Sequence, residues 1–467
     1  MKSREKYLFK NTMVFAIGSI GTKMIAFFLV PLYTNTLNTS EYGIADLIYT
    51  IGTVLVPLLT LNISEAIMRF ALDKDANYDR IMNIGVIFLT IATVAGSVIF
   101  PVAEWFGAVK GYGGYIYFYT VSLAYSQVML YYLRGKEELL KYSIGNIVHA
   151  VMIAVLNIAF LKLFKWGLHG YFLAYIVANM ITAIYAFAVG HVGSTFKGFS
   201  LDKILCRNML KYSVVLIPNS LMWWIMNSSD RVMLTSMMGT TANGIFAVSY
   251  KIPTLLTTLT TIFNQAWCYS AIREDESIDR DLYYNQVFEN LVAFILSGAA
   301  FILAIIKPFM KIYIAADYYV AWEYTPYLII GFVFLTIATF LSSTYTVNKD
   351  SKGFLYSGTC GALLNIVLNW ILIKRIGIAG AAIATAVGYI VVFVYRVVDT
   401  KKYVKINLCK FQYIMALIIL FAMAATVYID HMIGQCMLIA EFLIMALLFR
   451  KALTNIIAAL FKRFKKK

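Results

Sequence analysis

Fourteen long apolar stretches follow one another along this chain, separated by short segments that carry glycine, proline or charged residues. They lie near residues 9–33, 44–63, 81–103, 115–133, 143–163, 168–189, 213–238, 244–268, 286–306, 325–346, 355–373, 377–396, 411–429 and 433–449. Each is close to the roughly 20 residues that an α-helix needs to cross the hydrocarbon core of a membrane. The pattern predicts an all-α polytopic membrane protein with about fourteen transmembrane helices.

Composition supports this prediction. Of the 467 residues, 61% are hydrophobic and only 14% are charged, whereas a soluble domain is about half apolar and about a quarter charged. Fourteen spans would use about 280 residues, which leaves little room for a soluble catalytic domain. The five cysteines form no CxxC pair, so neither a disulfide framework nor a zinc site is expected.

Basic residues orient the predicted spans. If the N-terminus is cytoplasmic, 30 of the 40 Lys and Arg residues fall on the inside, 7 fall in outside loops and 3 fall within spans. Because cytoplasmic loops collect Lys and Arg, both termini are predicted to be cytoplasmic. The formal net charge of +16 then indicates orientation in the membrane and contact with anionic lipid, and no nucleic-acid partner is expected.

An internal repeat predicts the architecture. At an offset of 201 residues, eight of the 18 positions from Gly43 to Thr60 are identical to those from Gly244 to Thr261. The pattern Gly-x-x-Gly-x-x-x-Ala at residues 167–174 recurs at residues 377–384, where it is expected to let helices pack closely. We therefore predict six-helix bundles at residues 1–200 and 201–405, running in the same direction, followed at 406–467 by two extra helices and a basic amphipathic tail.

Charged residues inside the predicted spans are the candidate site. Such charges cost roughly 2.5–3.5 kcal/mol each, so they normally face a wet cavity or a partner. Lys23 lies near the middle of the first span, and Arg231 and Lys251 lie in the outer halves of the seventh and eighth. If all three project into one cavity between the halves, that cavity suits an anion such as pyrophosphate. The alternative is that Asp230 pairs with Arg231 or Lys251 to neutralise charge, and that Lys23 extends to the interface.

Further charged residues accompany this set. Asp46 begins the second span, which Glu65 and Arg69 close. Asp46 and Asp230 are alternatively protonation or sodium sites, although capping of a helix start explains Asp46 more simply; charge pairing is a further role open to both and to Glu65. The tyrosines of residues 112–132 are expected mainly at the membrane interface, with stacking on sugar rings as the alternative.

Motifs of catalysis are missing from the sequence. It contains no GxxxxGK[ST] loop, HExxH or GxSxG, and its four histidines are scattered. These absences predict that the chain is not an enzyme, does not hydrolyse ATP and needs neither a cofactor nor a metal.

Several segments resemble the bacterial Wzx-type flippases of polysaccharide biosynthesis. The similarity spans the chain and is strongest in residues 8–75 and 213–270. It is carried by Lys10-Asn-Thr-Met-Val-Phe, Val30-Pro-Leu-Tyr33, Tyr42-Gly-Ile-Ala-Asp-Leu47, Ser64-Glu-Ala-Ile-Met-Arg-Phe-Ala71, Asn227-Ser-Ser-Asp-Arg-Val-Met-Leu234 and Gly244-Ile-Phe-Ala-Val-Ser-Tyr-Lys-Ile-Pro253.

The resemblance implies the fold of the multidrug/oligosaccharidyl-lipid/polysaccharide (MOP) exporter superfamily, which includes the MATE transporters. It implies a multi-pass protein of the bacterial cytoplasmic membrane that turns undecaprenyl-pyrophosphate-linked oligosaccharides to the outer leaflet. It also implies that Lys23, Arg231, Lys251 and Arg69 bind the substrate, with membrane lipids, a polysaccharide polymerase and glycosyltransferases as partners. The alternatives are a cation-coupled multidrug exporter of the MATE type, a lipid II flippase and a membrane-embedded glycosyltransferase or polymerase.

Overall fold

The structure, a computed structural model, describes residues 21–73, 75–105, 111–196, 201–273, 279–407, 410–455 and 458. Every regular element in these ranges is helical, as predicted. The expectations for residues 1–20 and for most of the amphipathic tail lie outside the described residues.

Eight described segments are long and apolar enough to cross a membrane. They are α3 (Thr39–Leu59), α5 (Tyr78–Trp105), α7 with its π-helical end η1 (Leu139–Leu163), α8 (Gly167–Val189), α13 (Arg280–Tyr313), α14 (Thr325–Val347), α15 (Ser351–Ile376) and α16 with the 3-10 turn η4 (Ile378–Lys402). Shorter apolar helices follow at α17 (Phe411–Thr426) and α18 (Met432–Leu448). The polytopic membrane fold is confirmed, while the count of fourteen spans stays a prediction.

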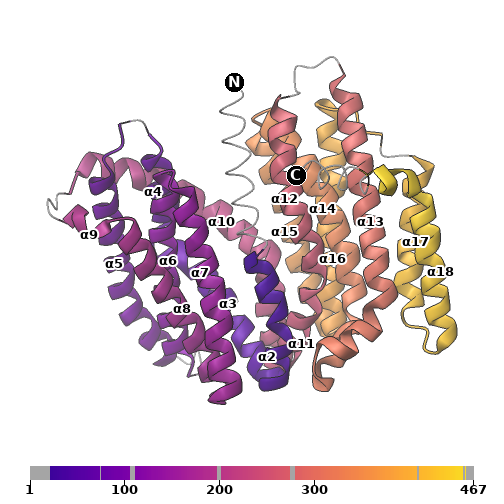
Figure 1. The fold of residues 1–467 in the computed structure, drawn as a ribbon, viewed down its shortest axis with the longest axis horizontal. Coiled ribbons are helices and arrows are strands. Elements are labelled where there is room, and N and C mark those ends of the chain that lie inside the picture. The colour runs from indigo at the N-terminus through magenta and orange to yellow at the C-terminus, as the bar shows by residue number, and fades with distance from the viewer. Residues whose placement is uncertain are drawn as a thin grey trace. The chain divides into compact units, whose positions relative to one another are not determined.

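The remaining helices complete the chain. They are α2 (Val30–Thr36), α4 (Ile63–Ala71), α6 (Gly113–Gly135), α9 (Val192–Thr195), α10 (Lys203–Met238), α11 (Thr240–Lys251), α12 (Pro253–Arg273) and the 3-10 helix η3 (Ala316–Glu323). Figure 1 shows the order of the labelled helices along the chain.

The chain packs as two compact units, Met1–Arg231 and Val232–Lys467. In the first unit, α6 packs against α3, α4, α5, α7 and α8, and in the second, α14 packs against α12, α13, α15 and α16. Each unit therefore surrounds one central helix with neighbours that follow the same order along the chain, as expected of a repeat. The predicted boundaries at residues 200 and 405 stay a prediction.

Glycines explain the repeated Gly-x-x-Gly-x-x-x-Ala pattern. Gly167 and Gly377, the first glycine of each copy, have φ angles of +53° and +61°, which glycine adopts at little cost. A Cβ on Gly170 would lie 3.0 Å from the Cβ of Phe160, and one on Gly380 would lie 2.4 Å from the backbone of Leu372. Both copies thus form a tight turn that brings two successive helices together, which confirms the packing role.

Two predicted spans are interrupted. The stretch 244–268 is divided between α11 and α12, with the break at Ile252 immediately before Pro253, because proline has no backbone N–H to donate to the helix. The second span was wrongly expected to end at Glu65 and Arg69. Helix α3 ends at Leu59, and residues 61 and 62 have φ angles of +50° and +56°, so Glu65 and Arg69 lie on the separate helix α4.

Candidate functional site

A buried ion pair joins two helices of the first unit. The Nε atom of Arg231 on α10 lies 3.1 Å from an Oδ atom of Asp46 on α3. The side chains are only 13% and 6% exposed. The contact is a charge contact, since the N–H···O geometry at this Nε falls short of a hydrogen bond.

Two polar contacts fix the same pair of helices beside it. The indole N–H of Trp224 donates to the backbone carbonyl of Thr50 at 2.9 Å, and an Nη atom of Arg231 donates to the Thr50 hydroxyl at 3.4 Å. Asp46 and Thr50 are four residues apart, and Trp224 and Arg231 are seven apart, spacings that place each pair on one face of its helix. The ion pair therefore belongs to a defined seam between α3 and α10.

Asn38 places Asp46 within α3. The Asn38 side chain accepts the backbone N–H of Glu41 at 2.9 Å, and the Glu41 carboxylate accepts the backbone N–H of Asn38 at 3.0 Å. This capping box begins the helix at Thr39, about two turns before Asp46. The expectation that Asp46 caps a helix start is therefore wrong, and its carboxylate is directed to Arg231 instead.

Tyrosines from several helices gather next to Asp46. We call Tyr33, Tyr42, Tyr49, Tyr119, Tyr171 and Tyr175 the tyrosine cluster. The ring of Tyr49 lies 5.9 Å from that of Tyr119 and 6.1 Å from that of Tyr175, and the hydroxyls of Tyr33 and Tyr175 lie 3.4 Å apart.

Tyr49 is the accessible member of this group. Its side chain is 43% exposed, whereas Tyr33, Tyr119 and Tyr171 are buried. It stands one turn after Asp46 on α3, close enough to interact with the charges of both Asp46 and Arg231. An accessible aromatic ring beside a paired guanidinium can bind a ligand that carries both an apolar ring face and an anionic group.

The other predicted residues of the site lie elsewhere. The Asp230 carboxylate is buried and accepts the backbone N–H of Arg231 at 2.9 Å. Lys251 is the last residue of α11 and is half-buried. Lys23 lies in the helical residues 21–28 with its side chain exposed.

Glu65 and Arg69 occupy different surroundings on α4. Arg69 is about half exposed and pairs with Asp73 at 2.6 Å within the same chain segment. Glu65 is half-buried, and this burial raises the pKa of its carboxyl, although nearby Arg134 and a hydrogen bond from Tyr131 oppose the rise. These two residues are thus placed with local partners and contribute no contact to the seam of Asp46 and Arg231.

The sequence predicted only part of this arrangement. Thr50, Trp224 and the tyrosine cluster were missed, because their residue types are common in membrane helices and carry no charge. Of the tyrosines expected at the membrane interface, Tyr119 and Tyr132 are buried inside the unit. The available signal was the spacing of Tyr42, Asp46, Tyr49 and Thr50 at helical intervals on one segment.

A sequence-family profile places the chain. The profile described as "Polysaccharide biosynthesis protein" matches residues 8–269. The chain belongs to this family. The family expected from the sequence motifs is therefore confirmed.

Individual relatives are distant. Protein 1 of the Lsg locus of Haemophilus influenzae is 20% identical over 351 residues, which is 73% of this chain and 83% of that protein. An uncharacterized membrane protein of Methanocaldococcus jannaschii is 22% identical over 427 residues, covering 85% of this chain and 99% of that protein.

Solved structures show the same fold. The lipid II flippase MurJ, in an inward closed conformation, gives a TM-score of 0.68 at 12% identity, over 95% of this chain and 100% of MurJ. A multidrug resistance MATE family transporter of the MOP superfamily, in an inward-facing conformation, gives 0.64 at 15% identity, over 88% of this chain and 96% of that one. The MOP-superfamily fold expected from the sequence is confirmed.

Proposed function

We propose that the protein is a flippase that carries undecaprenyl-pyrophosphate-linked oligosaccharide repeat units from the cytoplasmic to the outer leaflet, for surface polysaccharide biosynthesis. Membership of the polysaccharide biosynthesis family and the transporter fold support this class of activity. The observation that carries the proposal is the buried pair of Asp46 and Arg231 beside the accessible ring of Tyr49. Together they match a ligand with an anionic linkage and sugar rings.

Arg231 is the proposed anchor for the pyrophosphate. A guanidinium is planar, always charged and suited to two-point contact with phosphate oxygens. In this state Asp46 acts as its counter-ion, so the charge is neutralised while no substrate is bound. A bound pyrophosphate then replaces the carboxylate, and the carboxylate returns when the substrate leaves, so that Arg231 always has an anionic partner.

Other residues complete the proposed substrate contacts. Lys23 and Lys251 are proposed to add positive charge for the same anion, and Arg69 to attract it from its exposed position on α4. Tyr49 is proposed to stack on a sugar ring, since its face is accessible next to the charged pair. Glu65 and Asp230 are proposed to balance charge.

Alternating access is the proposed mechanism, and the membrane potential is a proposed source of energy. Outward movement of an anion runs with an inside-negative potential, at about 2.3 kcal/mol per charge per 100 mV. We place the chain in a bacterial cytoplasmic membrane with both termini in the cytoplasm. The proposed partners are the lipid-linked substrate, membrane lipids, a polysaccharide polymerase and glycosyltransferases, and the protein is proposed to be a transporter without enzymatic activity.

Asp46 bears on the rival function, a cation-coupled multidrug exporter. A carboxylate that is free to bind a sodium ion or a proton would suit such an exporter, but Asp46 already contacts the cationic side chain of Arg231 at 3.1 Å. The neutralised pair therefore favours an anionic ligand.

Complementation tests the proposal. Arg231→Ala, Arg231→Lys and Tyr49→Ala variants would be expressed in a host strain that lacks its own copy of the gene. Surface polysaccharide, lipid-linked precursor inside the cell and drug susceptibility would then be measured. We expect Arg231→Ala to abolish surface polysaccharide and to accumulate precursor, Arg231→Lys to retain part of the activity, and drug susceptibility to stay unchanged.

Arg80 supplies the matched control. It also pairs with an aspartate, Asp202, at 2.9 Å, but its side chain is 50% exposed. Arg80→Ala should leave polysaccharide export at the level of the unmodified protein. Normal surface polysaccharide in the Arg231→Ala variant would contradict the proposal, and loss of drug resistance without loss of polysaccharide would favour the exporter.

A further inference from the structure

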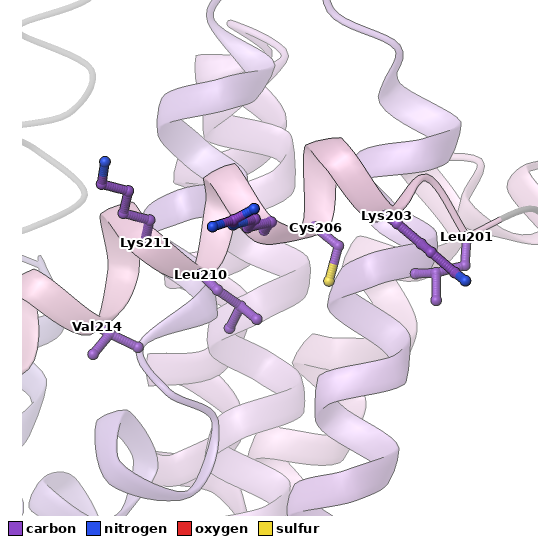
Figure 2. A pocket seen from close by; sticks show the side chains of 7 residues that line it. Leu201, Lys203, Cys206, Leu210, Lys211 and Val214 are labelled. Atoms are coloured by element: carbon purple, nitrogen blue, oxygen red, sulfur yellow. The ribbon is translucent and has the colours of Figure 1, made fainter.

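A hollow of about 600 Å³ lies against the first part of α10, within the first unit. Its lining comes from residues 201–214 and consists of Leu201, Lys203, Cys206, Arg207, Leu210, Lys211 and Val214. Figure 2 shows the labelled side chains along this one stretch of chain. Neither Asp46 nor Arg231 lines this hollow, so a ligand bound here is independent of the proposed function.

Three basic side chains form a stripe along this hollow. Lys203, Arg207 and Lys211 are spaced four residues apart, so they lie on one face of the helix at intervals of about 6 Å along its axis. All three are exposed. The opposite side of the same helix is fixed to the unit, because Met209 and Ser213 are fully buried. The stripe is therefore held outward on a firmly packed helix.

No carboxylate among the described residues forms an ion pair with this stripe. The nearest acid in sequence, Asp202, is otherwise engaged, since it pairs with Arg80 at 2.9 Å and accepts the backbone N–H groups of Ile204 and Leu205. These hydrogen bonds and Arg80 lower the pKa of Asp202. The three positive charges are left for an anion from outside the protein.

Large apolar side chains are exposed on the flank of the stripe. Ile204 is 77% exposed and Val215 is 71% exposed, and Val214 beside them is 44% exposed. On the helix, Ile204 and Val215 are neighbours of Lys211 in direction, about 20–40° away. A face that mixes exposed basic and apolar residues is typical of a helix at the membrane–water boundary, where the charged ends reach the headgroups and the apolar residues face acyl chains.

We infer that this hollow is a binding site for the phosphate headgroup of an anionic phospholipid. Arg207, the middle residue of the stripe, provides two-point contact with the phosphate oxygens, while Lys203 and Lys211 add charge from either side. The acyl chains lie along Ile204 and Val215. Both parts of the lipid thus find a matching surface, which a free anion would not need.

Native mass spectrometry of the detergent-purified full chain tests this inference. Palmitoyl-oleoyl-phosphatidylglycerol or the corresponding phosphatidylcholine is added, and bound lipid is counted at each concentration. The variant is K203Q/R207Q/K211Q. Its matched control is K349Q/K352Q/K401Q, which removes the same charge from three exposed lysines of the second unit. We expect the first variant to bind phosphatidylglycerol about tenfold more weakly or worse, the control to bind it normally, and phosphatidylcholine binding to be the same in both.

Further arms keep the result decisive. The charge-preserving variant K203R/R207K/K211R should bind phosphatidylglycerol within about twofold of the unmodified chain, so a folding defect in the first variant cannot imitate the effect. Equal losses in the first variant and the control would overturn the inference in favour of general surface charge. Displacement of the lipid by an equal concentration of inorganic phosphate would also overturn it, because the site would then bind a free anion.

Discussion

Removal of Arg231 should destabilise the protein more than its single contact suggests. At 3.1 Å and an effective dielectric constant of about 20, the attraction between the two charges is about 5 kcal/mol before desolvation is counted. Desolvation offsets much of this in the intact pair, but loss of one partner leaves the other charge buried alone. We therefore expect Arg231→Ala and Asp46→Ala each to lower the free energy of unfolding by about 3–5 kcal/mol.

A double-mutant cycle measures this coupling. The variants Asp46→Asn, Arg231→Gln and the double variant would be unfolded chemically in detergent as purified full chains. The double variant should recover much of the loss, because neither neutral side chain leaves a charge buried, and we expect a coupling energy of about 2–3 kcal/mol. A coupling energy below about 0.5 kcal/mol would refute the reasoning, since it would mean that water screens the pair.

Arg69 and Asp73 provide the internal comparison for this cycle. Their atoms are closer, at 2.6 Å, but the side chains are 51% and 52% exposed. We expect no detectable coupling between them, because exposed pairs are screened by solvent. If the two pairs showed equal coupling, distance alone would decide the energy and burial would be irrelevant.

Three further outcomes are expected. Gly52→Ala should cost about 1–3 kcal/mol in unfolding free energy, because its Cβ would lie 2.5 Å from the ring of Tyr119; unchanged stability in chemical denaturation would contradict this. Ser357→Ala should cost about 1–3 kcal/mol in the same measurement, because the buried guanidinium of Arg396 donates to this hydroxyl at 3.0 Å, whereas a loss no larger than that of Ser351→Ala at an exposed position would show that the bond is dispensable. The pKa of Asp350 is lowered by hydrogen bonds and by a nearby lysine, so its stabilising effect is present at neutral pH and is lost as pH falls below its usual pKa of 3.8 through the lower folded value; Asp350→Asn should lower the melting temperature at pH 7 and flatten its fall in acid, and an unchanged acid profile would be evidence against this role.

Much of the fold could be predicted from the sequence, because hydrophobic length is what a membrane demands of a helix. The stretch 168–189 corresponds to α8 at Gly167–Val189, and 325–346 corresponds to α14 at Thr325–Val347. The interruptions at Ile252 and at residues 61–62 were missed, since a hydropathy pattern continues across a local break in the backbone. Pro253 was the one signal for the first break.

The site was predictable in its charges and unpredictable in its pairing. Asp46 and Arg231 stood out because acids and bases are rare inside spans. Asp230 is the obvious partner by sequence adjacency, yet neighbouring residues on a helix point about 100° apart. The observed partner, Asp46, comes from a helix far away in the chain, and only the packing of α3 against α10 could reveal it.

The glycine turns before α8 and α16 have a consequence for tracing the ancestry of the chain. Gly167 and Gly377 hold backbone angles that other residues adopt only with strain, and Gly170 and Gly380 leave no room for a methyl group. Side chains can diverge freely after a gene duplication, but these backbone requirements do not relax. The two turns are therefore fixed landmarks from which the halves of distant descendants can be aligned, even where no other identity survives.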